Sequence, residues 1–210
     1  MLDFDGVRQG DQTLADLARN LSHADLHTLT DEMIDTVLAI IEEATAADVV
    51  FVPEDPDAND AFGASAEVNL PWTLGHVIVH ATASSEEAAA LGSALARGIE
   101  IEGRSRYETD WRTIRSVAQV RQRLEESRHM RHAFLDSWPY QPHLEVMYTG
   151  FASLGPMNAT GRFLLGLMHE DSHLAQLREI MRQAHEGYSR VPSKERATSR
   201  LSGLLPFLRK

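Results

Sequence analysis

The chain has 210 residues, 43% of them apolar, and a formal net charge of −11, and it contains no cysteine. This length supports one soluble domain with a sizeable core, and the negative charge argues against binding to nucleic acid or to anionic membranes. Without cysteine, disulfides and thiolate metal ligands are excluded, so histidines and carboxylates remain as candidate ligands. The first residues lack a basic, apolar leader and no run is apolar enough to span a bilayer, so we expect a cytoplasmic protein.

Apolar residues recur mainly at every third or fourth position, which predicts an all-α protein. A short helix is expected near residues 14–21, followed by a first long helix over residues 24–47. Residues 49–68 contain many prolines and acids, so an irregular connection is expected there. The acidic run at residues 54–60 lacks the ligand pattern of a calcium-binding loop, and we interpret it as a solvated turn.

Three more long helices are expected. They cover residues 71–97, 113–138 and 158–185. Pro71 suits the first turn of the second helix with Asn69 as its cap, and Gly187 suits the end of the fourth. Residues 139–156, rich in proline and glycine, form a long connection. The sequence therefore predicts a four-helix bundle with at least one long crossover connection.

The C-terminal end of the chain is expected to cover the bundle. A short helix is expected at residues 193–201, and an apolar tail follows at residues 204–208. Apolar side chains gain free energy by leaving water, so we expect this tail to pack back on the body.

Two pairs of histidines are spaced four residues apart in these helices, His76 with His80 and His169 with His173. This spacing places two imidazoles on one face of a helix, where both can reach one metal ion. His169 and His173 lie in an otherwise apolar helix and are the stronger candidates, but a usable site needs a third ligand. Spacing alone does not choose between His76 and His80, because both share a helix face with Trp72.

Trp72, His76 and His80, followed far downstream by His169, His173 and Gln176, form a pattern that resembles the DinB-like (DinB/YfiT) superfamily of metalloenzymes. The stretch from Arg106 to Trp111 is also similar to that family. The resemblance covers about residues 12–185. It implies one domain over residues 1–210, an all-α four-helix bundle of the DinB/YfiT type with short extra helices at the termini. The bundle core would span about residues 12–187, with residues 188–210 as a C-terminal extension packed on the body.

The resemblance also implies a ligand set. In that superfamily one ligand follows a tryptophan by eight residues, which selects His80 and gives His80, His169 and His173 as ligands of a divalent metal. Three histidines leave one coordination position open, as in catalytic metal sites. Zinc or nickel is expected, with iron or manganese as alternatives. Gln176 is a candidate pocket residue, although its amide can equally bond a backbone carbonyl.

Three functions remain open at this point. The resemblance implies a metal-dependent transferase that joins a low-molecular-weight thiol, such as bacillithiol, mycothiol or glutathione, to a small electrophilic substrate. A metal-dependent hydrolase is the second, with Glu170 or Asp171 as candidate proton acceptors, although helical geometry turns both away from His169. The third is a non-catalytic bundle that binds a partner or forms a homodimer. Trp72 and Trp111 are candidate walls of a substrate pocket, or else core packing.

Overall fold

The computed structural model describes residues 1–56, 58–59, 67–103 and 107–190. Within these ranges every regular element is helical, which confirms the all-α prediction; the strand-like pairing is limited to one bridge between Tyr148 and Met157. In chain order the helices are α1 (Asp5–Gln9), α2 (Leu14–Ala18), α3 (His23–Ile40), α4 (Ala46–Val49), α5 (Leu74–Ala96), η1 (Trp111–Thr113), α6 (Val117–Asp136), η2 (Ala152–Leu154), α7 (Ala159–Ser172) and α8 (Leu174–Arg190).

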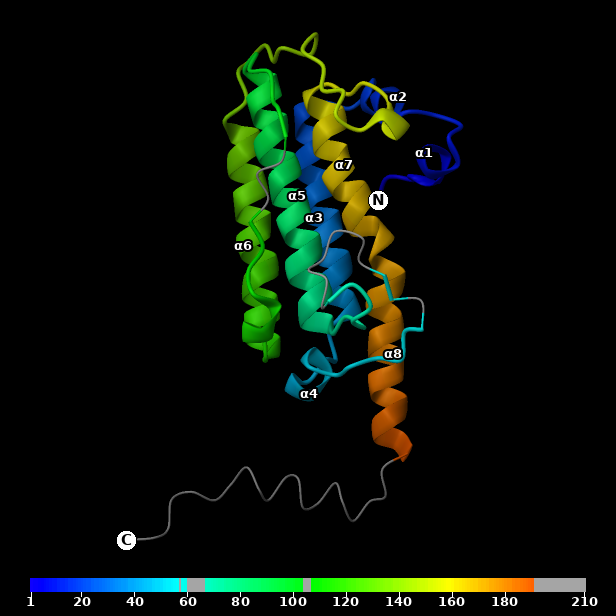
Figure 1. Cartoon of the computed structure of the whole chain (residues 1–210). Coiled ribbons are helices and arrows are strands. Elements are labelled where there is room, and N and C mark those ends of the chain that lie inside the picture. Colours follow the sequence, from blue (N-terminus) through cyan, green and yellow to red (C-terminus); the bar gives the residue numbers. More distant parts are fainter. Residues whose placement is uncertain (57, 60–66, 104–106, 191–210) are drawn as a thin grey trace, which may run out of the picture.

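The long helices lie side by side in a helical bundle (Figure 1). α5 packs against α6 and α7, and α3 packs against the same two helices. α3 and α6 are antiparallel, since Asp31 bonds Arg128 while His23 reaches the carbonyl of Leu135. Each helix therefore turns one face towards a shared interior.

α5 and α6 run parallel, because Glu86 pairs with Arg123 while Ser93 bonds Ser137 further along both helices. The chain must therefore return along the bundle between the end of α5 and the start of α6 (Figure 1). The predicted crossover is thus the segment between residues 97 and 116. Residues 139–156 are indeed a connection, but they join neighbouring ends of α6 and α7.

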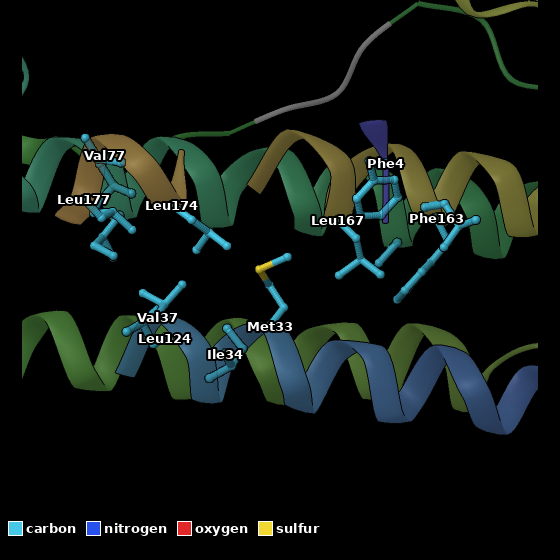
Figure 2. Packing of buried hydrophobic residues seen from close by; sticks show 14 of the residues in the cluster. Phe4, Met33, Ile34, Val37, Val77, Leu124, Phe163, Leu167, Leu174 and Leu177 are labelled. Atoms are coloured by element: carbon cyan, nitrogen blue, oxygen red, sulfur yellow. The ribbon is translucent and has the colours of Figure 1, made fainter. Parts of the chain in front are cut away.

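The core lies between the α3–α6 pair and the α5–α7 pair (Figure 2). Met33 and Val37 of α3 point across it towards Val77 of α5 and towards Leu174 and Leu177, which are buried at the start of α8. Each fully buried aliphatic side chain of this kind contributes about 1.5–3 kcal/mol relative to an exposed one. Because such residues recur at three- and four-residue steps along each helix, they lie on one face of it, and that face is buried in the core.

Several predicted helix boundaries are wrong, and side-chain caps account for two of them. The first long helix ends at Ile40 rather than near residue 47, because Thr45 and Asp48 form a reciprocal capping box that begins α4. The second begins at Leu74, since the Thr73 hydroxyl accepts the backbone N–H of His76 at 3.2 Å. Pro71 and its expected cap Asn69 lie ahead of the helix.

The sequence predicts one continuous fourth helix, but the structure has two, α7 and α8, which meet at His173. The Ser172 hydroxyl donates to the carbonyl of His169 at 2.5 Å, and the His173 N–H bonds the carbonyl of Glu170 instead. A serine hydroxyl that competes for a helical carbonyl bends the backbone in this way. Gly187 does not end the helix, because its φ is not positive and α8 runs on to Arg190.

Gly166 lets α7 approach α5 very closely. A Cβ atom at this position would lie 2.6 Å from the Cβ of Ala88 and 2.9 Å from the Cα of Ser85. Only glycine permits this backbone distance. The contact lies one helical turn before His169, so it sets how near that side chain comes to α5.

Within the described ranges, no helix has the length and apolar composition of a membrane span. The helix predicted at residues 193–201 and the apolar tail at residues 204–208 lie outside the described residues. The same is true of most of the predicted C-terminal extension. The single-domain organisation stays a prediction.

Candidate metal centre

The structure brings together the three histidines that the sequence predicted as ligands. His80 comes from α5, His169 from the last turn of α7, and His173 from the junction with α8. One ring nitrogen from each can be chosen so that the three atoms lie within 4.8 Å of one another. The Nε2 atoms of His80 and His169 are 3.2 Å apart. Three imidazole nitrogens at such distances can converge on one first-row metal ion, for which N–metal distances are about 2.0–2.1 Å.

Burial favours the metal-binding form of His173. His80 is 8% exposed, and His169 and His173 are half-buried. Burial lowers the pKa of His173, the hydrogen bond to Gln176 acts in the opposite direction, and the neighbouring His80 lowers it further. A lowered pKa keeps the ring neutral near pH 7, and only a neutral imidazole has a lone pair for a metal.

Gln176 fixes the orientation of His173. Its Oε1 atom lies 2.9 Å from Nδ1 of His173, so Nδ1 donates the hydrogen bond and Nε2 is left with the lone pair. An outer hydrogen bond of this kind sets the tautomer and angle of a ligand ring. The sequence predicted that Gln176 lines the pocket, and its amide bonds His173 of the candidate cluster rather than a backbone carbonyl.

Glu108 was missed by the sequence prediction. Its Oε2 atom is 3.6 Å from Nδ1 of His80, on the side of the ring away from Nε2. At this distance the negative charge favours a proton on Nδ1, which leaves the lone pair on Nε2 for a metal. The contact depends on the return of the chain between α5 and α6, which a pattern of neighbouring residues does not reveal. The sequence offered one signal for Glu108: it lies in the stretch from Arg106 to Trp111 that is similar to the family. Arg106 itself lies outside the described residues.

Trp72 separates the two histidines of α5. Its ring stacks on His76 with centroids 4.5 Å apart and also contacts His80 at 4.4 Å. On its other side His76 stacks on Trp111 at 4.8 Å, with the planes 8° apart. His76 is therefore held between two indoles, and the metal-binding group includes His80 instead.

A cavity of about 230 Å³ opens beside His173. It is lined by Asp55, Ala58, Asn59, Leu70, Trp72, His173 and Gln176. Trp72 therefore walls a pocket as well as packing on histidines, whereas Trp111 borders a different hollow. The acidic run at residues 54–60 is more than a solvated turn, since Asp55 and Asn59 face this cavity; Asp57 and Asp60 lie outside the described residues.

Glu170 and Asp171 take no part in this cluster. The Glu170 carboxylate accepts from Arg131 at 2.7 Å and from Ser85 at 3.1 Å, inside the bundle. Asp171 pairs with Arg8. Helical geometry predicted that both would turn away from the histidines, and their engagement elsewhere removes them as proton acceptors at this site.

Comparison with known proteins supports this location for a metal site. A family model described as the DinB superfamily matches residues 9–177, a range that includes the three histidines, Glu108 and Gln176. No curated protein and no solved structure matches the chain.

Proposed function

The chain belongs to the DinB superfamily, and from this premise we propose that it is a metal-dependent enzyme whose His80, His169 and His173 hold one divalent cation. The observation that supports the proposal best is the convergence of three ring nitrogens from separate parts of the fold within 4.8 Å. Three histidine ligands are the usual number for a catalytic zinc site, in which a fourth position is open. Zinc or nickel suits imidazole ligands best.

A divalent cation at this place would supply Lewis-acid activation of a thiol or of water. The residues around it hold the ligand rings in place, through the carbonyl oxygen of Gln176 and the carboxylate of Glu108. The cavity beside His173 gives a small molecule access to the cluster. The chain contains no cysteine, so any sulfur nucleophile must arrive with a cofactor or substrate.

On these grounds we propose transfer of a low-molecular-weight thiol to a small electrophile as the reaction. Hydrolysis is the second candidate, because a metal ion held by three histidines can activate a bound water molecule as the nucleophile. The two reactions differ in whether thiol or water is consumed.

A direct test uses metal-depleted protein reconstituted with zinc, nickel, manganese or iron. Glutathione, bacillithiol and mycothiol are each supplied with a chlorodinitrobenzene, and nitrophenyl esters are supplied without thiol. We expect thiol conjugation that depends on the metal, disappears in His169→Ala and survives in His143→Ala, an exposed histidine bonded to Glu145. Metal-dependent ester cleavage alone would favour the hydrolase. No metal-dependent turnover in either assay would contradict an enzymatic role and favour a binding protein.

A further inference from the structure

We infer that the cavity beside His173 selects substrates or thiols that carry an amino group, and that Asp55 recognises the positive charge. The inference rests on the proposed function, because it concerns the molecule that reaches the histidine cluster through this cavity. It adds a specificity residue and a substrate class to that proposal.

The lining of the cavity has the chemistry of a site for a cation. Its polar side chains are Asp55, Asn59 and Gln176, and its remaining walls include Trp72 and Leu70. Asp55 carries the only formal charge among the described lining residues other than histidine, and that charge is negative. Carboxylate and amide oxygens accept hydrogen bonds from an ammonium group, whereas a carboxylate on the ligand would meet repulsion.

The segment that carries Asp55 is fastened to α8. The Glu54 N–H donates to Oε1 of Gln183 at 2.8 Å, and Nε2 of Gln183 donates to the Glu54 carbonyl at 3.0 Å. Gln183 thus pairs with the backbone of Glu54 as a neighbouring strand would. The next residue, Asp55, is therefore held beside the helix that follows His173.

The Asp55 carboxylate remains available for a ligand. It is half-buried, and no hydrogen bond or ion pair within the described ranges of the chain engages its side chain. Most other acids near the bundle surface are already paired, as Asp171 is with Arg8 and Asp31 with Arg128. A half-buried carboxylate in a cavity wall interacts more strongly with a charged ligand than an exposed one does, because water screens it less.

The test measures thiol affinity of the metal-loaded protein without relying on turnover. Protein loaded with cobalt(II) is titrated with cysteamine and its longer homologue aminobutanethiol, with neutral mercaptoethanol and with anionic mercaptopropionate. The absorption band that sulfur gives on binding cobalt(II) reports each dissociation constant. Every thiol is compared with itself across variants, so differences in thiol acidity cancel.

Asp55→Asn removes the charge at nearly constant shape. We expect this variant to bind at least one aminothiol about tenfold more weakly than wild type, to bind mercaptopropionate more tightly and to bind mercaptoethanol equally. Asp55→Lys should enlarge both charge-dependent changes. Asp11→Asn is the matched control: it removes the same charge between α1 and α2, outside the cavity lining, and should leave all affinities unchanged.

The outcomes separate the two proposals. Cobalt and thiol binding with no effect of Asp55→Asn or Asp55→Lys on any charged thiol would overturn the inference and leave the proposed function standing. An equal effect of Asp11→Asn would also overturn it, because the preference would then come from overall charge. Failure to bind cobalt, or cobalt binding without any thiol, would contradict the thiol-transfer proposal and the inference with it.

Discussion

The described part of the chain contains two clusters of three histidines, and within it only one of these clusters has the geometry of a metal site. In the first, one nitrogen from each of His80, His169 and His173 can lie within 4.8 Å of the others. The second joins His23 and His27 of α3 to His132 of α6, with ring centroids as close as 4.7 Å. His23 and His27 are also four residues apart, the same spacing as His169 and His173. Spacing and proximity therefore do not distinguish the clusters.

The convergence of the ring nitrogens does distinguish them. In the α3–α6 cluster, Nε2 of His23 faces the Leu135 carbonyl at 2.8 Å and Nε2 of His132 faces Asp31 at 2.8 Å. The Nδ1 atoms of His27 and His132 face each other as a hydrogen-bonded pair. Each of these nitrogens faces a single partner, and among the described residues the three histidines whose ligand atoms all lie within 4.8 Å of one another are those of the first cluster. A metal site needs lone pairs directed at one place, as in the first cluster.

The largest expected effect that separates the clusters is stabilisation by metal. A ligand present at 100 times its dissociation constant raises the free energy of unfolding by about 2.7 kcal/mol. We expect added zinc or nickel to stabilise wild type and His27→Ala by this amount, and His80→Ala not at all. Urea unfolding with and without metal measures the difference. Equal stabilisation of His80→Ala would place the metal elsewhere.

A smaller effect is expected from the residue that orients His173. Gln176→Ala removes the acceptor for Nδ1 of His173, and loss of such an outer partner weakens metal binding about 10- to 100-fold. The matched control is Gln122→Ala, because Gln122 bonds Glu126 on the exposed side of α6 and should leave affinity unchanged. Competition with a chromogenic chelator gives both dissociation constants. If the two variants bind metal equally, the orienting role of Gln176 is wrong.

His76 offers a sharper contrast within one helix. His76→Leu removes stacking on Trp72 and Trp111, and each aromatic pair contributes about 0.5–1.5 kcal/mol of stability. The variant should unfold at lower urea while its metal affinity falls far less than that of His80→Ala. The same chelator competition and urea unfolding provide both values. The reverse order of affinities would show that His76, not His80, is the ligand on α5.

The smallest expected effect is on the pH dependence of stability, through His27 of the α3–α6 cluster. Burial lowers the pKa of His27 below its ordinary value of 6.5, and the neighbouring His132 and His23 lower it further. The unfolded chain then takes up this proton more readily than the folded protein, so stability from this group is present above about pH 6.5 and is lost as pH falls below it.

Metal-free wild type should therefore lose more free energy of unfolding between pH 7 and pH 5 than His27→Gln does, as measured with urea. His173, whose pKa is also lowered by burial, contributes equally to both proteins and cancels. Identical pH dependences would mean that His27 titrates alike in both states.

Much of the fold was predictable because helical periodicity is a local feature of the sequence. The spacing of the candidate ligand histidines is local in the same sense. The positions of α3, α5 and α6 follow from apolar residues at three- and four-residue steps. The break at His173 was not predictable from periodicity, since it depends on whether the Ser172 hydroxyl bonds the His169 carbonyl. In the same way, the start of α4 inside the predicted first helix depends on the capping box that Thr45 and Asp48 form.

The site shows the same division between local and distant contacts. Gln176 could be placed beside His173 because three residues separate them on one helix. Glu108 and Asp55 reach the cluster and its cavity from connections. The position of Glu108 depends on the path of the chain between α5 and α6, and that of Asp55 depends on the distant contact between Glu54 and Gln183. Apolar patterning carries no information on that path. A family resemblance chose His80 over His76, and the structure gives the physical reason in the stacking of Trp72, His76 and Trp111.

The most direct test of the metal centre is the metal content of protein purified without a histidine tag and without chelators. We predict about one divalent ion per chain in wild type and in His27→Ala, and none in His80→Ala, His169→Ala or His173→Ala. Elemental analysis alongside circular dichroism separates loss of metal from loss of fold. Wild-type protein that contains no metal and takes up no zinc, nickel or manganese, or a His169→Ala variant that keeps full occupancy, would contradict the account.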